Sequence, residues 1–189
     1  MQSNKAGKLF VYAGASGVGK GTIMKELLKR DPSIKLSVSA TTRAPREGEA
    51  DGREYFFVTK EKFEEMIKED GFLEYARYCD NYYGTPKSYV DEQLEKGYNV
   101  FLEIELQGAK NVLRLRPDAV SIFILPPSVE ELERRLRDRG TETEDSILKR
   151  LSQAQVEIGS ADMYRYTVVN DDLEKAIEDV LSIVRKETC

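Results

Sequence analysis

The residues best suited to do chemistry are glycines and a lysine that follow a short apolar run near the N-terminus. Residues 9–13, Leu-Phe-Val-Tyr-Ala, lead into Gly-Ala-Ser-Gly-Val-Gly-Lys-Gly-Thr at residues 14–22, the spacing of a phosphate-binding loop between a strand and a helix. Glycines let the backbone curl so that successive N–H groups point at one oxyanion, and Lys20 can reach the β- and γ-phosphates. The stretch predicts a site for a nucleoside triphosphate.

A glycine-rich turn that binds nothing is the alternative. The lysine and the full four-residue spacer favour the phosphate site, as does a following amphipathic segment with Ile23, Leu27 and Leu28 on one face. One residue departs from the general pattern, because Gly21 stands where a serine or threonine would ligate magnesium. We expect Thr22 to serve that role indirectly.

Composition bounds the class of protein. The chain has 189 residues, of which 40% are hydrophobic and 33% charged, enough for one sizeable core. Its net charge of −5 argues against a general nucleic-acid-binding surface. The sequence has neither an apolar run of the ~20 residues that span a membrane nor an apolar N-terminal segment, so we expect a cytoplasmic protein. Cys79 and Cys189 are expected to be free thiols.

Strand-like and helix-like patterns alternate along the chain, which predicts an α/β protein with a parallel sheet core covered by helices. The clearest strands are residues 9–13, 99–104 and 119–125. Ser128 and Glu131 form a capping box at a helix start, and Thr85-Pro86 predicts a threonine N-cap with proline in the first turn. The last helix is expected from about Leu173, with an apolar stripe of Ala176, Ile177, Val180, Leu181 and Val184.

Two segments interrupt this alternation. Residues 37–83 carry short strand patterns at 55–58 and 72–75 with one helix between them, which predicts an inserted α+β lobe. Residues 137–145 are all charged, glycine or threonine and predict a flexible flap. Arginines gather near both segments and could neutralise phosphates or be solvated surface charges: Arg43, Arg46 and Arg53 in one group, Arg134, Arg135, Arg137, Arg139 and Arg150 in the other.

Over residues 9–185 the chain resembles the guanylate kinases. The resemblance rests on the glycine loop and on six further motifs in the family's order. These are Ser-Val-Ser-Ala-Thr-Thr-Arg-Ala-Pro-Arg at 37–46, Asp-Gly-Arg-Glu-Tyr-Phe-Phe at 51–57, Asn-Tyr-Tyr-Gly-Thr at 81–85, Leu-Glu-Ile-Glu-Leu-Gln-Gly at 102–108, Arg-Gly-Thr-Glu at 139–142 and Val-Asn-Asp-Asp at 169–172.

The resemblance implies a phosphotransferase that moves the γ-phosphoryl of ATP to GMP. The GMP phosphate would be held by Arg43, Arg46, Tyr55 and Tyr83. The guanine would be read by Ser39, Glu74, Thr85 and Glu105. A carboxylate such as Glu74 can accept from both N1–H and the 2-amino group of guanine, a pairing that adenine cannot reproduce. Glu105 stands where many members have aspartate.

On the donor side, the resemblance implies that the loop holds ATP and that arginines of a short lid close over the phosphates. ATP would contact Gly14, Ala15, Ser16, Gly17, Val18, Gly19, Lys20, Gly21, Thr22, Asn170 and Asp171, and the groups that stabilise the transferred charge would be Lys20, Arg43, Arg135, Arg139 and Arg150. Mg²⁺ is the expected cofactor, near Thr22 and Glu103, through water. Glu103 could equally be an ordinary buried or surface carboxylate.

The expected organisation is a single domain. Residues 1–36, 86–133 and 151–189 would form the core, 37–85 a GMP-binding lobe and 134–150 the lid, in a monomer or homodimer without nucleic-acid or membrane partners. One alternative is a non-catalytic module of the same fold that binds partner peptides, against which the intact Lys20, Arg135 and Arg139 speak. Another is a kinase of this fold with a different acceptor, against which Ser39, Glu74 and the paired tyrosines speak.

Overall fold

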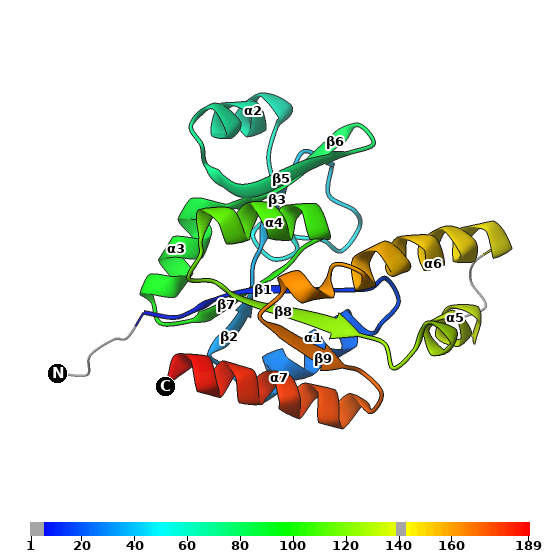
Figure 1. The fold of residues 1–189 in the computed structure, drawn as a ribbon. Helices are drawn as coiled ribbons and strands as arrows, with labels where there is room; N and C mark the ends of the chain where they lie inside the picture. Colours follow the sequence, from blue (N-terminus) through cyan, green and yellow to red (C-terminus); the bar gives the residue numbers. More distant parts are fainter. Residues whose placement is uncertain (1–5, 139–142) are drawn as a thin grey trace. The chain divides into compact units, whose positions relative to one another are not determined.

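A computed structural model describes residues 6–138 and 143–189 and confirms the α/β class (Figure 1). The chain divides into two compact units. Unit 1 contains the residues up to Leu9 together with Ser33–Ala119, and unit 2 contains Phe10–Pro32 and Val120–Cys189. Each predicted nucleotide site lies within one unit, so the units are described in turn.

Unit 2 is built on parallel strands. Strand β8 (Val120–Leu125) pairs in parallel with β1 (Leu9–Gly14) and with β9 (Tyr166–Val169). These strands are short apolar runs, as expected for a sheet covered on both faces. The helices are α1 (Lys20–Arg30), α5 (Val129–Asp138), α6 (Glu144–Ile158) and α7 (Leu173–Thr188), with a 3₁₀ turn at Ala161–Met163. Helix α1 packs against α7, and α5 against α6.

Helix starts and faces in unit 2 largely follow the sequence pattern. The Ser128 hydroxyl accepts from the backbone N–H of Glu131 at 3.1 Å, which confirms the predicted cap. Helix α7 begins at Leu173, and its predicted apolar stripe is buried. The predicted face of α1 was wrong at Leu28, which is 38% exposed, whereas Met24 is buried beside Ile23 and Leu27.

Unit 1 holds a short parallel pair and a separate four-stranded sheet. Strand β2 (Ile34–Leu36) pairs in parallel with β7 (Asn99–Glu103). The second sheet has the order β4-β3-β6-β5, formed by β3 (Ser39–Thr41), β4 (Tyr55–Phe57), β5 (Phe72–Tyr78) and β6 (Asn81–Pro86). The helices of unit 1 are α2 (Lys60–Lys68), α3 (Lys87–Glu95) and α4 (Leu106–Leu115).

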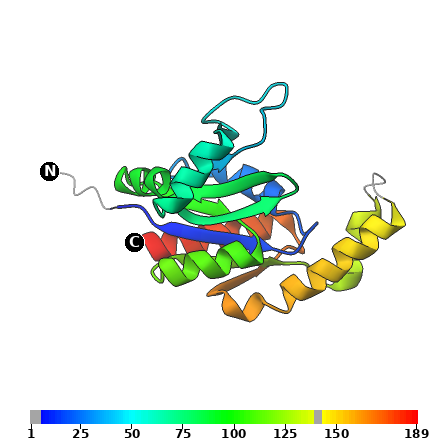
Figure 2. The same cartoon turned by 90° about the horizontal axis from the view of Figure 1, so that it is seen from above.

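The four-stranded sheet has its own apolar cluster, in which Ala40, Phe63 and Phe72 are buried. Helix α2 lies between β4 and β5 in the chain and supplies Phe63, whose ring stacks on Phe72 with centroids 4.3 Å apart. The segment that joins β3 to β4 extends outward as a long loop (Figure 2).

The predicted domain boundaries at 37–85 and 134–150 stay predictions.

Helix α3 begins directly after Thr85-Pro86, but the predicted threonine N-cap was wrong. Strand β6 continues through Pro86, which is itself the N-cap residue of α3, and the Thr85 hydroxyl donates to Glu74 rather than to the helix. Pairing with β5 thus outweighs the local helix signal.

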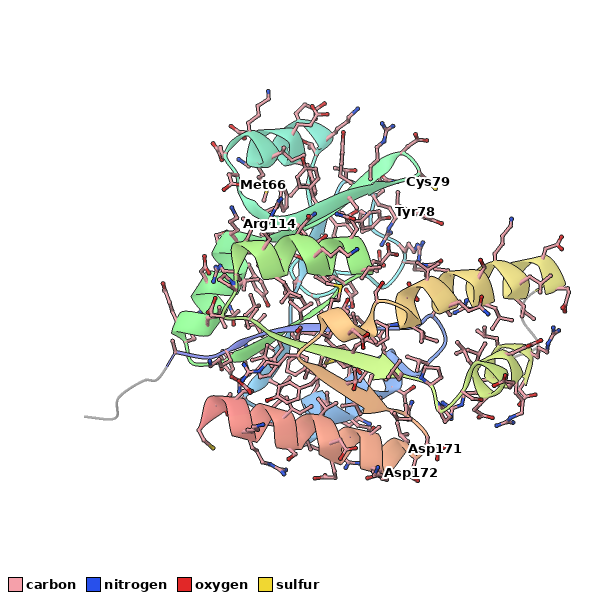
Figure 3. The ribbon with its side chains drawn as sticks, in the orientation of Figure 1. Met66, Tyr78, Cys79, Arg114, Asp171 and Asp172 are labelled. Atoms are coloured by element: carbon pink, nitrogen blue, oxygen red, sulfur yellow. The ribbon has the colours of Figure 1, made fainter. Side chains whose placement is uncertain are left out.

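The two cysteines are free and exposed, as predicted. Cys79 lies beside Tyr78 at the turn between β5 and β6 (Figure 3). Across the described ranges, no helix combines the length and the apolar character that crossing a bilayer requires.

Candidate functional site

The glycine loop in unit 2 has the backbone shape that its sequence predicts. Gly17 and Gly19 have φ of 86° and 96°, values that side chains of L-residues rarely adopt. Gly19 is also the N-cap of α1, so the positive end of that helix faces the loop. The Lys20 ammonium donates to the carbonyl oxygens of Gly14 at 2.7 Å and Ala15 at 3.2 Å. The loop therefore carries a fixed positive charge and inward-curving backbone, which suit a phosphate.

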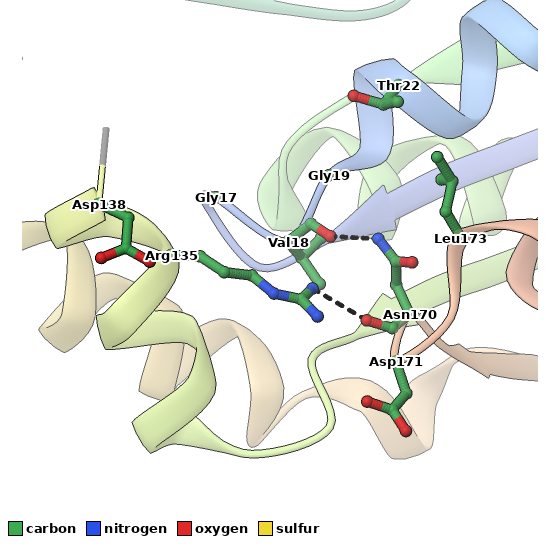
Figure 4. Close-up of a pocket in the computed structure, with 9 residues that line it drawn as sticks. All are labelled: Gly17, Val18, Gly19, Thr22, Arg135, Asp138, Asn170, Asp171 and Leu173. Atoms are coloured by element: carbon green, nitrogen blue, oxygen red, sulfur yellow. Dashed lines mark hydrogen bonds between the residues drawn. The ribbon is translucent and has the colours of Figure 1, made fainter. Parts of the chain in front are cut away.

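A cavity of about 420 Å³ opens beside this loop (Figure 4). It brings together several predicted donor-site residues, namely Gly17, Val18, Gly19, Thr22, Arg135, Asn170 and Asp171. Its lining also includes Asp138 and Leu173, which the sequence analysis did not assign.

Asn170 connects the walls of this cavity. Its side-chain amide nitrogen donates to the backbone oxygen of Val18 at 2.7 Å. Its backbone carbonyl accepts from Arg135 Nη1 at 2.9 Å (Figure 4). Asn170 is buried, whereas the next two residues, Asp171 and Asp172, lie exposed where β9 gives way to α7 (Figure 3). The N-cap of α7 is Asp172, whose carboxylate accepts from Lys175 N at 2.8 Å.

Helix α6 contacts the loop through Ser16. Arg150 donates to the Ser16 hydroxyl from Nε at 3.1 Å and from Nη2 at 3.0 Å. The Ser16 backbone N–H donates to Glu157 Oε2 at 3.0 Å. Glu157 was missed in the sequence analysis. Arg139, the remaining predicted lid arginine, lies outside the described residues.

The predicted phosphate cradle in unit 1 centres on Arg43. Its guanidinium lies 5.5 Å from the centroid of the Tyr55 ring, and the rings of Tyr55 and Tyr83 meet edge to face at 6.0 Å. The pKa of Arg43 is raised, chiefly by its hydrogen bond to Glu49 and in smaller part by Tyr83.

Glu49, which the sequence analysis missed, holds this cradle in place. Arg43 Nη2 donates to both Glu49 oxygens, at 2.9 and 3.0 Å, and Arg46 N donates to Glu49 Oε2 at 2.7 Å. Hydrogen bonds from Arg43 lower the pKa of the Glu49 carboxyl. Arg46 is exposed and the contact described for it is through its backbone, so the predicted role of its guanidinium stays a prediction.

A second cavity, of about 470 Å³, lies in unit 1 and is lined by three of the four residues expected to read guanine, while the fourth, Thr85, is not part of its lining. Ser39, Tyr55, Glu74, Tyr83, Glu103 and Glu105 line it, together with the unassigned Tyr75, Arg77, Tyr78, Gln107, Gly108 and Asn111 among others. Ser39 begins β3, Glu74 lies in β5, and Glu103 ends β7. Three separate stretches of sequence thus converge on one cavity.

Glu74 is the most distinctive group in this cavity. Its Oε1 accepts from the buried Thr85 hydroxyl at 2.6 Å. Burial raises the pKa of Glu74 above its ordinary 4.5, and the charge of Glu105 adds to the rise. On the other side, a Cβ built on Gly108 would lie 3.2 Å from Glu74 Oε2. Gly108 therefore leaves the space in which that oxygen can face a ligand.

The residues predicted near magnesium offer few ligands. Thr22 lies exposed in the donor cavity, and Glu103 lies exposed in the acceptor cavity. Within residues 6–138 and 143–189, no cluster of three or more His, Cys, Asp or Glu side chains could hold a metal. The hydroxyl of Thr22 and the carboxylate of Glu103 are oxygen donors, the kind of ligand that Mg²⁺ takes.

Comparison with known proteins identifies the family. The guanylate kinase family model matches residues 6–187. A guanylate kinase of Caldanaerobacter subterraneus subsp. tengcongensis is 50% identical over 189 residues, covering all of this chain and 92% of that protein. One of Clostridioides difficile is 55% identical over 183 residues, covering 97% and 89%.

A solved structure gives the same answer. The crystal structure of guanylate kinase from Anaplasma phagocytophilum superposes with a TM-score of 0.72 at 34% identity, covering 97% of this chain and 87% of that one. The resemblance drawn from the motifs is confirmed: the chain belongs to the guanylate kinase family.

Proposed function

We propose that unit 2 binds ATP, that unit 1 binds GMP, and that the enzyme transfers the γ-phosphoryl group to give ADP and GDP. One observation carries the acceptor assignment. A half-buried carboxylate, Glu74, shares a cavity with Tyr55 and Tyr83, whose hydroxyls suit a phosphate. A nucleoside monophosphate satisfies both sets of groups: the N–H donors of its base pair with the carboxylate, and its phosphate accepts from the tyrosine hydroxyls.

On the donor side, Lys20 and the loop N–H groups bind the triphosphate. Phosphoryl transfer is catalysed mainly by positioning and by stabilising spread negative charge, so the arginines act with Lys20. Arg135, held on the Asn170 carbonyl, and Arg150, held on the Ser16 hydroxyl, already lie against the loop segments. Arg139 belongs to this set by the family resemblance.

On the acceptor side, Arg43 supplies the permanent charge of the phosphate cradle, and Tyr55 and Tyr83 supply neutral donors. Arg46 extends the cradle when GMP binds. An arginine suits this task because its planar group grips two phosphate oxygens and stays protonated. Glu49 fixes the orientation of Arg43 through two contacts to one nitrogen.

Base selectivity follows from Glu74, with Ser39, Thr85 and Glu105 around it. Thr85 donates to Glu74 Oε1, so the carboxylate is turned with Oε2 toward Gly108 and the cavity. An anionic acceptor there matches the N1–H and 2-amino donors of guanine. Adenine has an acceptor at N1, so its binding leaves Oε2 of the half-buried Glu74 without a donor from the base, which is costly.

Magnesium is the proposed cofactor. When bound with ATP it supplies charge neutralisation and orients the phosphates. Thr22 and Glu103 are the residues proposed to lie near it, through water. Gly21 offers no hydroxyl, so this chain contributes less to the metal than a loop with serine or threonine at that position.

The test is ADP release from ATP and Mg²⁺ with GMP, and in parallel with AMP, CMP or UMP. We expect release with GMP alone. Lys20→Ala should fold and lose about 100-fold or more in turnover, the scale of one preorganised charge-stabilising donor. Release with another monophosphate would overturn the acceptor assignment, and normal turnover of Lys20→Ala would remove the loop from the mechanism.

A further inference from the structure

Two side chains of helix α6 form hydrogen bonds with the same residue of the phosphate loop, Ser16. Arg150 donates to the hydroxyl of Ser16 at 3.1 and 3.0 Å, and the backbone N–H of Ser16 donates to Glu157 Oε2 at 3.0 Å. Arg150 and Glu157 are seven residues apart and therefore lie on the same face of the helix, two turns from each other. The loop is thus held by side chain and backbone at once.

A carboxylate at the position of Glu157 is electrostatically unfavourable, which suggests that it has a functional role. Glu157 lies in the last turn of α6, where the helix dipole disfavours negative charge, and that turn has no basic residue to offset it. It also lies at a loop that is to receive a polyanionic triphosphate. Local preferences that a sequence violates in this way mark functional positions.

The surroundings of Glu157 keep its carboxylate on the loop. Gln153 Nε2 donates to its second oxygen, Oε1, at 3.0 Å. Tyr164 is buried, and its hydroxyl has no hydrogen-bond partner among the described residues. The pKa of Tyr164 is raised to about 12, mainly by burial and further by the charge of Glu157. With Oε1 held by Gln153, the other oxygen, Oε2, stays directed to the Ser16 N–H.

We propose that Glu157 is a positioning residue of the donor site. By fixing the Ser16 N–H, it sets the peptide that carries the Ser16 side chain, so that the hydroxyl faces Arg150. The hydroxyl in turn holds the guanidinium of Arg150 at the loop. Glu157 acts through Ser16 and touches no substrate. The inference rests on the proposed donor role of the loop and adds a residue to it.

Two substitutions at Glu157 separate geometry from charge. Glu157→Ala removes the acceptor and should lower kcat about tenfold, the scale of one misplaced charged donor, with the KM for GMP unchanged. Glu157→Gln retains an acceptor oxygen of the same reach and should restore kcat to within about twofold of the parent. Gln155→Ala, an exposed residue two positions earlier on α6, is the matched control.

Ser16→Ala tests whether Glu157 acts through the Ser16 hydroxyl. This variant keeps the backbone N–H and loses the hydroxyl, so it should show the same loss of kcat as Glu157→Ala. Adding Glu157→Ala to Ser16→Ala should then cost less than about twofold more, because residues acting as one unit are not additive. Ser16→Ala also keeps the inference testable if Glu157→Ala fails to fold, which its melting temperature would reveal.

Three results would overturn the inference: parental kcat in Glu157→Ala, an equal loss in Glu157→Ala and Glu157→Gln, or fully additive losses in the double variant. Lys20→Ala distinguishes this failure from that of the donor site. If Lys20→Ala is impaired and Glu157→Ala is not, the positioning role alone is wrong. If Lys20→Ala turns over normally, the donor assignment itself is wrong.

Discussion

Glu74→Gln is the substitution that most directly probes the acceptor site. Thr85 donates to Glu74 Oε1 at 2.6 Å, and in the variant the same hydroxyl would hold the amide oxygen. The amide nitrogen would then occupy the place of Oε2, beside Gly108 and facing the cavity. An acceptor that should pair with guanine becomes a donor, while the size and shape of the side chain stay the same.

The size of the effect follows from the hydrogen bond lost. A hydrogen bond to a charged group contributes about 1.5–3 kcal/mol, and each 1.36 kcal/mol is a factor of ten. The KM for GMP should therefore rise about 10- to 150-fold, with the KM for ATP within about twofold of the parent. Glu65→Gln, at an exposed carboxylate on α2 in the same unit, should change neither constant.

The raised pKa of Glu74 adds a pH signature. GMP binding needs the ionised carboxylate, so the KM for GMP should rise as pH falls through the Glu74 pKa, which burial places above the ordinary 4.5. The folded protein holds this proton more tightly than the unfolded chain, so Glu74 makes the free energy of unfolding fall as pH rises through that window. Glu74→Gln should abolish this pH dependence and raise the melting temperature at neutral pH.

Steady-state kinetics with each nucleotide varied in turn, from pH 5 to 8, and thermal melts over the same range test these points. Equal losses for ATP and GMP would show that Glu74 has a structural role. A raised KM for GMP combined with a lower melting temperature at neutral pH would refute the reasoning from burial.

Three further predictions concern single positions. Gly108→Ala would bring a Cβ to 3.2 Å from Glu74 Oε2 and should weaken GMP by about 1 kcal/mol, roughly fivefold in KM; an unchanged KM would mean that Glu74 moves freely. Gly21→Ser meets no atom within 4 Å of its Cβ and should retain activity and stabilise α1 by about 0.5 kcal/mol, seen as a slightly higher melting temperature; loss of turnover would show that phosphate must approach the backbone there. Tyr164→Phe removes a buried hydroxyl without a partner among the described residues and should stabilise the fold by about 1 kcal/mol, or about 2–4 °C; a lower melting temperature would reveal a partner.

The sequence predicted the elements whose signals are local. Strands β1, β7 and β8 are apolar runs buried along nearly their whole length, and the glycine loop has a spacing that few other structures use. Local signals failed where a distant partner intervened. The Thr85 hydroxyl, expected to cap a helix, pairs with Glu74 eleven residues earlier, because β5 and β6 run antiparallel.

Two of the residues missed at the sites contact partners that are distant in the sequence. Glu157 contacts Ser16 across 141 residues, and Gly108 on α4 faces Glu74 on β5. A periodic pattern shows which face of a helix is apolar but does not show which loop a polar side chain on it will meet. For Glu157 a weak signal existed, since an acid in the last turn of a helix opposes its dipole. Glu49 contacts Arg43 only six residues away, but in a segment without helix or strand that spacing predicts no contact.

The structure also shows that the arginines of the second sequence group, near residues 134–150, have different hydrogen-bond partners. Arg134 and Arg137 donate to carboxylates at the exposed surface of α5 and at the start of α6, and such exposed pairs contribute little and leave little net field. Arg135 shares the Glu131 carboxylate with Arg134 at 2.8 Å and in addition donates to the backbone carbonyl of Asn170, whereas Arg150 donates to the hydroxyl of Ser16. A neutral acceptor fixes the direction of a guanidinium without cancelling its charge, which suits a group that must stabilise phosphate. Lys20 is oriented in the same way, because its ammonium donates to the carbonyl oxygens of Gly14 and Ala15.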